Sequence, residues 1–152
     1  MEQKKYTLLG GDYATTWKGH TLLRIKYLRD VGDIVKAGEL GGYLESYSNL
    51  SQERDCVVTG NAMVMENAMV YGNARVTGES LVRGNARVYE KAAVFGLANV
   101  RENAKVHGIA TIDGEAVVKG DADISGDAYF TSDALATTGR ICSGYYDRMQ
   151  LP

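Results

Sequence analysis

Small and apolar side chains recur every six residues between residues 54 and 137 of this chain. The segment divides into 14 consecutive hexads without a break. The third position of the hexad is Ala in 12 units, and the fifth position is Val in 10. The exceptions are Cys56 and Ser80 in the third column and Ile112, Ile124, Phe130 and Ala136 in the fifth. Two columns this regular predict one repeated structural unit stacked along an axis.

The hexad period predicts short β-strands separated by corners. The third and fifth positions are two residues apart, so their side chains point to the same side of an extended chain. The first two positions are mostly Gly followed by Asn or Asp, residues that tolerate the positive φ angles of tight corners. Three hexads then form one coil, and successive coils stack about 4.8 Å apart. The pattern predicts an all-β chain folded as a parallel β-helix of about five coils, with Ala near the corners and Val on the flat faces.

The same columns resemble the hexapeptide-repeat family, whose fold is a left-handed β-helix. In that family an aliphatic residue and a small residue four positions later define the unit, as Val70 and Ala74 do here. A closer resemblance covers almost the whole chain. The segments 40–46 and 49–53, followed by Gly-Asn-Ala-Arg-Val repeats, are similar to phage, prophage and bacterial proteins often labelled transferases. The resemblance implies a left-handed helix and trimers packed along parallel axes, whereas the transferase label follows the fold and says little about chemistry.

Three regions are expected from where the period begins and ends. Residues 1–53 should form an N-terminal β cap and an irregular first coil, with strands at Tyr6–Leu9 and Thr21–Leu28. Residues 54–137 form the solenoid. Residues 138–152 break the period and should form a C-terminal cap or tail. Caps at both ends would stop the terminal coils from pairing with other strands.

Composition narrows the choice of partners and compartment. The formal net charge is −2, so no global positive field would recruit nucleic acid. No apolar run reaches the length of a signal or membrane segment, which predicts a cytoplasmic protein. The resemblance implies that the cell is a bacterium or a phage-infected host. Cys56 and Cys142 lie in coils too far apart for a disulfide, and no metal-ligand spacing is present. No cofactor is expected.

One predicted outer face combines an apolar stripe with a basic column. The stripe, interrupted by Asn99, contains Met63, Leu81, Val117 and Leu135. Beside it, Arg83, Arg101 and Lys119 recur at the spacing of one coil. An apolar stripe favours association, and stacked cations repel one another unless a carboxylate or a bound anion neutralises them. We therefore expect this face to be buried in the homotrimer that the resemblance implies, with a small anionic metabolite or nucleotide signal as a candidate ligand in the subunit clefts.

A second predicted face carries an aromatic ladder. Tyr71, Tyr89 and His107 recur at the same spacing, flanked by Arg87 and Lys105. Aromatic ladders stabilise parallel stacks by themselves. The same residues can also hold a planar anion by stacking and guanidinium contacts. Both interpretations stay open at this point.

Candidate catalytic residues are scarce. His20 and His107 are the two histidines, and acyltransferases of this fold rely on a histidine as general base near a subunit boundary. Neither histidine has a neighbouring pattern that marks an orienting carboxylate, and no phosphate loop or nucleophile elbow is present. The scarcity of catalytic residues, taken with the resemblance, favours a non-catalytic trimeric β-solenoid of phage or mobile-element type, acting as a binding or assembly module. The alternative is an acyltransferase of the hexapeptide-repeat class.

Overall fold

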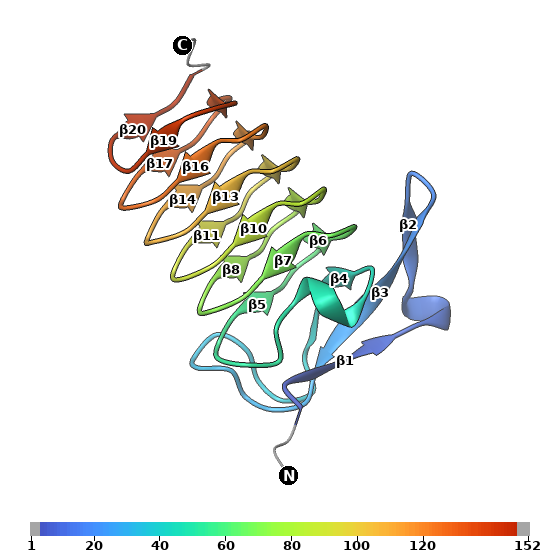
Figure 1. The fold of residues 1–152 in the computed structure, drawn as a ribbon. Helices are drawn as coiled ribbons and strands as arrows, with labels where there is room; N and C mark the ends of the chain where they lie inside the picture. The colour runs from blue at the N-terminus through green and yellow to red at the C-terminus, as the bar shows by residue number, and fades with distance from the viewer. Residues whose placement is uncertain (1–3, 149–152) are drawn as a thin grey trace.

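Two-residue parallel strands stack into three sheets that form the sides of a β-solenoid (Figure 1). The structure, a computed structural model, describes residues 4–148 of the 152. Every hexad from 54 to 137 contributes one strand, formed by its fourth and fifth residues. The all-β solenoid predicted from the hexads is therefore confirmed.

Each sheet collects every third strand along the chain. The first sheet contains β1 (Tyr6–Leu9), β3 (His20–Tyr27), β4 (Leu40–Leu44), β6 (Met63–Val64), β9 (Leu81–Val82), β12 (Asn99–Val100), β15 (Val117–Val118) and β18 (Leu135–Ala136), with β2 (Thr15–Trp17) paired to β3. The second sheet contains β7 (Met69–Val70), β10 (Arg87–Val88), β13 (Lys105–Val106), β16 (Asp123–Ile124) and β19 (Arg140–Ile141). The third sheet contains β5 (Val57–Val58), β8 (Arg75–Val76), β11 (Ala93–Val94), β14 (Thr111–Ile112), β17 (Tyr129–Phe130) and β20 (Tyr145–Tyr146). Two short 3-10 turns, η1 (Gly11–Tyr13) and η2 (Tyr47–Asn49), lie in the N-terminal region.

The coils keep an 18-residue register through the hexads, and both ends add strands. Leu81 pairs with Asn99, which illustrates the regular register. Tyr43 pairs with Met63, a separation of 20 residues, because the first coil carries two extra residues before the hexads begin. At the other end, β19 and β20 pair with β16 and β17 although they lie outside the hexad period. The solenoid therefore has about six coils, where the hexads indicated about five.

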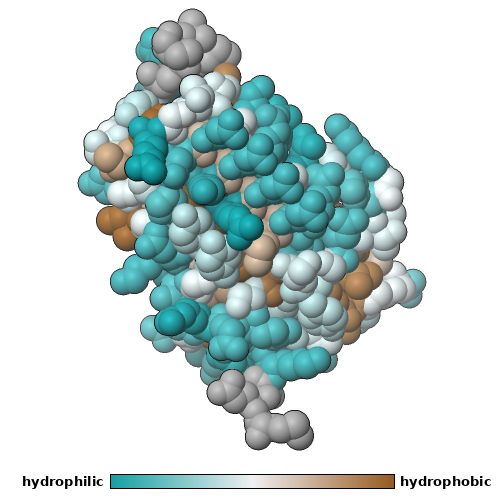
Figure 2. Space-filling view, viewed as in Figure 1, coloured by the Kyte–Doolittle hydropathy of each residue, from teal (hydrophilic) through white to brown (hydrophobic). Residues whose placement is uncertain are grey.

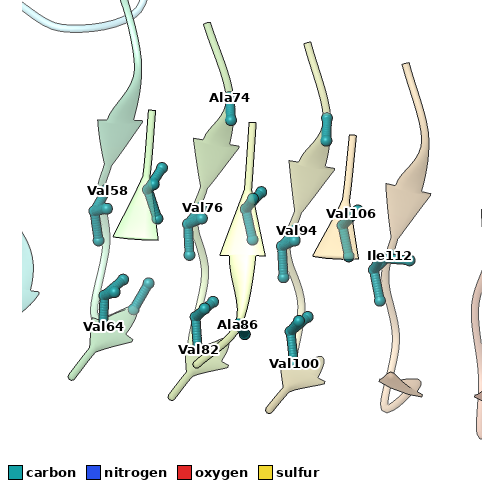
Figure 3. Close-up of a cluster of buried hydrophobic side chains, with 14 of the residues drawn as sticks. Val58, Val64, Ala74, Val76, Val82, Ala86, Val94, Val100, Val106 and Ile112 are labelled. Carbon is teal, nitrogen blue, oxygen red and sulfur yellow. The ribbon is translucent and has the colours of Figure 1, made fainter. Parts of the chain in front are cut away.

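The two repeated columns form the core. Their side chains have at most 5 % of their surface exposed. Figure 3 shows Val76, Val82, Val94 and Val100 pointing into the space between the sheets. Full burial of a side chain of this size contributes about 1.5–3 kcal/mol. The inward assignment of both columns is confirmed, and these columns are the main source of apolar burial in the solenoid.

Glycine or glutamate turns most corners in the left-handed backbone region. Glu66, Glu90 and Glu102 have φ angles of 58°, 59° and 59°. This conformation costs a residue with a side chain about 1–2 kcal/mol. Each glutamate offsets part of the cost, because its Oε1 accepts a hydrogen bond from the backbone N–H of the glycine one coil later, at 2.9, 3.1 and 3.0 Å respectively. The corner glutamates therefore connect neighbouring coils.

An asparagine ladder connects the coils at the corner between the first and second sheets. Asn67 Nδ2 donates to Asn85 Oδ1, and Asn85 Nδ2 donates to Asn103 Oδ1, both at 3.2 Å. Asn103 continues the series to Asp121 at 3.4 Å. Amide ladders of this kind favour in-register stacking of parallel strands.

An antiparallel unit covers the first coil. Strand β3 pairs with β1 on one side and with β4 on the other, and β4 continues in parallel with β6. The cap and the first sheet are therefore one continuous sheet. Tyr27 of β3 is fully buried, and its hydroxyl donates to Val58 O at 2.7 Å. The β2–β3 hairpin projects from this unit beside the solenoid (Figure 1).

Two side chains that the period placed on the outer surface are buried. Val57 belongs to the same buried cluster as Val31 and Val35, which come from the segment between β3 and β4. Met65 is also 0 % exposed. Periodicity alone puts Val57 outside because it carries no information about where a neighbouring segment folds back over a coil.

The two cysteines lie near opposite ends of the solenoid. Cys56 is buried and Cys142 is exposed, and both are free thiols. Within residues 4–148, no helix is long and apolar enough to cross a membrane. The last part of the expected C-terminal tail, residues 149–152, lies outside the described residues.

Candidate functional site

The apolar stripe follows one column of the first sheet. We call the outer surface of strands β6, β9, β12, β15 and β18 the apolar face. Its central column contains Met63, Leu81, Asn99, Val117 and Leu135, which lie in register on successive strands and are all partly exposed. Figure 2 shows the side of the molecule over β7, β10 and β13, which is mainly hydrophilic with small, separate hydrophobic patches.

Buried polar atoms without a hydrogen-bond partner are concentrated on the first sheet. Among the described side chains there are four, Nε of Arg24, Arg83 and Arg101 and Oδ1 of Asn99. Arg24 belongs to β3 and Asn99 to β12, while Arg83 and Arg101 directly follow β9 and β12. An unpaired buried polar group costs about 1–3 kcal/mol. Buried polar groups in proteins are nearly always hydrogen-bonded. Here the four that lack a partner all lie along one sheet.

The basic column is less uniform than its sequence spacing indicates. The Arg83 guanidinium lies over the Trp17 ring, with Cζ 5.2 Å from the ring centroid. Arg101 Nε lies 3.9 Å from Glu102 Oε2, the outer limit of an ion pair. Lys119 forms no ion pair within residues 4–148. A search for carboxylates in the same column misses Glu102 because it occupies the adjacent corner.

Acidic side chains line the opposite edge of the apolar face. Glu79, Glu115 and Asp133 are exposed at the corners that precede β9, β15 and β18. In the part of the chain that the structure describes, none of the three forms an ion pair. Across one coil the outward order is Glu115, Val117, Lys119. The face therefore has an acidic edge, an apolar centre and a basic edge.

The β2–β3 hairpin is held near the basic edge by a histidine between two carboxylates. His20 Nδ1 lies 2.8 Å from Glu45 Oε2, and His20 Nε2 lies 3.7 Å from Glu66 Oε2. The hydrogen bond with Glu45 raises the pKa of His20 above its ordinary value, and the same bond lowers the pKa of Glu45. Trp17 of the same hairpin packs on Arg83. The hairpin thus contacts the solenoid and its first coil through the two ion pairs of His20 and one cation–π contact.

We expect this hairpin to loosen as the pH rises through the raised pKa of His20. The contact is strongest where His20 is protonated and Glu45 is ionised, and it weakens when His20 loses its proton. The other charged groups that act on His20 are Glu66, which favours the proton, and Arg83, which opposes it. Trp17 is the single tryptophan, so its fluorescence between roughly pH 5 and pH 9 reports the hairpin directly.

A matched variant distinguishes the loss of the His20 contact from the effect of other titrating groups on Trp17 fluorescence. Glu45→Gln keeps the side-chain shape but removes the charge that raises the pKa of His20, so the fluorescence midpoint should move to lower pH. High salt should also move the midpoint to lower pH, because the ion pair is partly exposed and dissolved ions screen it. A Trp17 titration identical in the two proteins would show that His20 does not hold the hairpin.

The aromatic ladder forms as a stack on the second sheet. The Tyr71 and Tyr89 rings are 4.9 Å apart and 1° from parallel, and the Tyr89 and His107 rings are 4.7 Å apart and 2° from parallel. His107 Nδ1 lies 2.8 Å from Glu90 Oε1, and its Nε2 lies 2.6 Å from Asp123 Oδ1. The hydrogen bond with His107 lowers the pKa of Glu90. The ladder is thus stacked from ring to ring and tied to two carboxylates at one end.

The cations predicted to flank the ladder, Arg87 and Lys105, lie at paired positions on neighbouring strands of the second sheet. Arg87 Nη1 lies 3.6 Å from Met69 Sδ, so its guanidinium points along the column of outward side chains toward the preceding coil. Arg87 and Lys105 are both exposed. A shallow pocket of about 470 Å³ lies on the other side of the ladder, within the 300–1,000 Å³ range of small-molecule sites. It is lined by Tyr71 and Tyr89 together with Arg54, Gly72, Asn73, Glu90, Lys91, Gly108 and Ile109.

Both histidines have carboxylate partners that sequence reasoning missed. The partners Glu45, Glu90 and Asp123 are each 16 to 25 residues from their histidine, so they come close only through coil stacking and cap docking. His107 thus has a carboxylate within hydrogen-bond distance of each ring nitrogen. Among the described residues, no group of three or more His, Cys, Asp or Glu side chains could hold a metal ion. The register of 18 residues, applied to charged side chains, would have found the contact between His107 and its partners.

Comparisons with known proteins give no assignment. No family model matches the chain, and no curated protein matches it. The function of the protein is therefore inferred from its surfaces.

Proposed function

We propose that this protein is a non-catalytic β-solenoid that self-associates as a homotrimer through its apolar face and serves as a binding or assembly module. The observation that carries the proposal is the placement of the unpaired buried polar atoms on the sheet that also presents the apolar stripe. A second copy would cover the partly exposed stripe and place further polar groups beside these side chains. The resemblance to hexapeptide-repeat proteins of phage and bacterial type supports the trimer and a left-handed helix.

The charge order across the apolar face favours parallel solenoids. When two copies meet with their axes parallel and in register, the acidic edge of one faces the basic edge of the next at the same height. Glu115 of one copy then approaches Lys119 of its neighbour. In an antiparallel pair, acidic edges face acidic edges and basic edges face basic edges, which is unfavourable. A cyclic assembly with heterologous contacts therefore fits this face.

A small anion is the ligand class that suits the clefts between such subunits. Arg83 and Arg101 each have a buried Nε without a hydrogen-bond acceptor, and Lys119 has no described ion pair. Phosphate or carboxylate oxygens satisfy guanidinium groups in bidentate geometry. An anionic metabolite or nucleotide bound there would be shared by neighbouring subunits. The acyltransferase alternative receives less support, because both nitrogens of His107 are already engaged.

The oligomeric state tests the proposal directly. Light scattering at micromolar concentration should give the mass of a trimer for the unmodified protein. Val117→Glu with Leu135→Glu should yield monomers or aggregates, because association would bury unpaired charges. The matched control is Thr111→Glu, a half-buried position on the third sheet in β14, the strand that precedes β15 along the chain; this variant should leave the trimer intact. A monomeric unmodified protein would end the proposal.

A charge-swap series tests the parallel arrangement. Glu115→Lys alone and Lys119→Glu alone should each weaken the trimer, because each places like charges together at every subunit contact. The double variant Glu115→Lys/Lys119→Glu should restore it, because the two edges are again complementary. We expect the dissociation constant to rise about tenfold in each single variant, equivalent to about 1.4 kcal/mol, and to return in the double variant. If the double variant instead binds more weakly than either single variant, by the sum of their two losses, the acidic edge of one copy does not contact the basic edge of the next.

A further inference from the structure

A buried lysine and a buried cysteine meet where the N-terminal strand joins the solenoid. Lys5 and Cys56 are both 0 % exposed, and Lys5 Nζ lies 3.1 Å from Cys56 Sγ. Three backbone carbonyls also surround Nζ, those of Cys56 at 2.6 Å, Glu53 at 3.3 Å and Arg54 at 3.4 Å. This ring of acceptors satisfies a group that would be costly to bury alone, and it fixes the amine against the sulfur.

Cys56 differs from an ordinary buried structural cysteine in its position and in its neighbour. Cys56 occupies the third column of the first hexad, where Ala is the common residue, so packing alone does not require sulfur there. Burial lowers the pKa of Lys5, which increases the fraction of neutral amine. A neutral amine is a nucleophile, and 3.1 Å is a distance from which it can attack the sulfur once that sulfur is oxidised.

We propose that Lys5 and Cys56 form a covalent, reducible sulfur–nitrogen cross-link under mild oxidation by a peroxide. Hydrogen peroxide first converts the thiol to a sulfenic acid, in which an S–O bond forms, the O–O bond breaks and one water leaves. Nζ of Lys5 then attacks Sγ, so that an N–S bond forms and the S–O bond breaks. The hydroxyl leaves as a second water with a proton from the amine. In sum, one peroxide becomes two waters, and the pair loses two hydrogens.

The bond would join the start of the N-terminal strand to the first hexad. Lys5 precedes β1, and Cys56 precedes β5, at a sequence separation of 51 residues. The cap contains β1, β2, β3 and the hairpin that contacts the apolar face, so the cross-link would fasten this whole unit to the solenoid. A covalent link across a long segment stabilises a fold chiefly by restricting the unfolded chain.

Intact mass spectrometry of the full chain tests the proposal. The starting protein is Cys142→Ser, which leaves Cys56 as the single thiol. After treatment with hydrogen peroxide, the mass should fall by about 2 Da, and dithiothreitol should reverse the change. Trypsin should no longer cleave after Lys5, and the digest should contain one peptide pair that joins residues 5 and 56. The melting temperature should rise by about 5–10 °C.

Two variants make the outcome decisive. Cys56→Ala places the most common residue of its column at this site, so the protein should fold, lose the mass change and lose the rise in melting temperature. Lys5→Arg keeps a cation at the site but should not give the cross-linked peptide. A gain of about 32 Da at Cys56, the mass of a sulfinic acid, would overturn the proposal, as would a thiol that still reacts fully with iodoacetamide after peroxide treatment and unfolding.

Discussion

Replacing Ala86 with leucine should lower the free energy of unfolding by about 1–3 kcal/mol. Ala86 is 0 % exposed and lies in a column with Ala68 and Ala104, which are equally buried one coil away on each side. A larger side chain has no space to enter there unless the coils move apart. Such a movement would strain the hydrogen bonds from Met69 N to Ala86 O and from Arg87 N to Ala104 O, both 3.0 Å long.

Denaturant or thermal unfolding measures this loss. A decrease of about 3–10 °C in the melting temperature corresponds to it for a chain of this size. The neighbouring variant Arg87→Leu is the matched control, because Arg87 is exposed and points outward. If both variants melt at the same temperature, Ala86 is not in the packed interior.

Replacing Gly108 with alanine should cost a similar amount, for a different reason. Gly108 has a φ angle of 66°, and a Cβ atom on it would approach the backbone N of Gly126 at 2.7 Å. Alanine would combine left-handed backbone strain of about 1–2 kcal/mol with this close contact. Glutamate at the same position should cost less than alanine, because Glu66 and Glu90 adopt this conformation and accept a hydrogen bond from the next coil.

At this corner we therefore expect the glycine protein to be the most stable, the glutamate variant to be less stable and the alanine variant to be the least stable. Chemical denaturation of Gly108→Ala and Gly108→Glu in parallel gives the order directly. Glutamine keeps an acceptor oxygen but has no charge, so Gly108→Gln should be about as stable as Gly108→Glu if the hydrogen bond is the cause. An alanine variant more stable than the glutamate variant would show that the corner glutamates do not compensate for their backbone strain.

The regular part of the fold could be predicted because it is encoded locally. Each hexad repeats one small and one branched side chain, and a period of six with this spacing fits a strand and a corner. The three outer faces followed from the same register, as the pairing of Leu81 with Asn99 and of Arg87 with Lys105 shows. The ladder of Tyr71, Tyr89 and His107 also followed, because residues one coil apart must stack.

The irregular parts could not be predicted because they depend on contacts between distant segments. No local pattern indicates that His20 reaches Glu45 or that Trp17 reaches Arg83, since both contacts depend on how the hairpin folds over the solenoid. Strands β19 and β20 lack the hexad pattern, yet they pair through backbone groups that any sequence possesses. The site residues Arg87 and Lys105 were placed on the correct sheet, but their convergence on a ligand stays a prediction.

The three-sheet register has a consequence for insertions and deletions. Every hexad supplies an equivalent pair of core side chains, so loss of six residues within the repeats would leave the interior filled. The outer surface would change completely beyond that point, because each later residue would move to the preceding side of the prism. Val117, for example, would leave the apolar face for the position that Thr111 holds on the third sheet. Loss of a full coil would shorten the molecule by about 4.8 Å and return every side chain to its own side. The interior tolerates any multiple of six, whereas a surface used for recognition tolerates only multiples of eighteen.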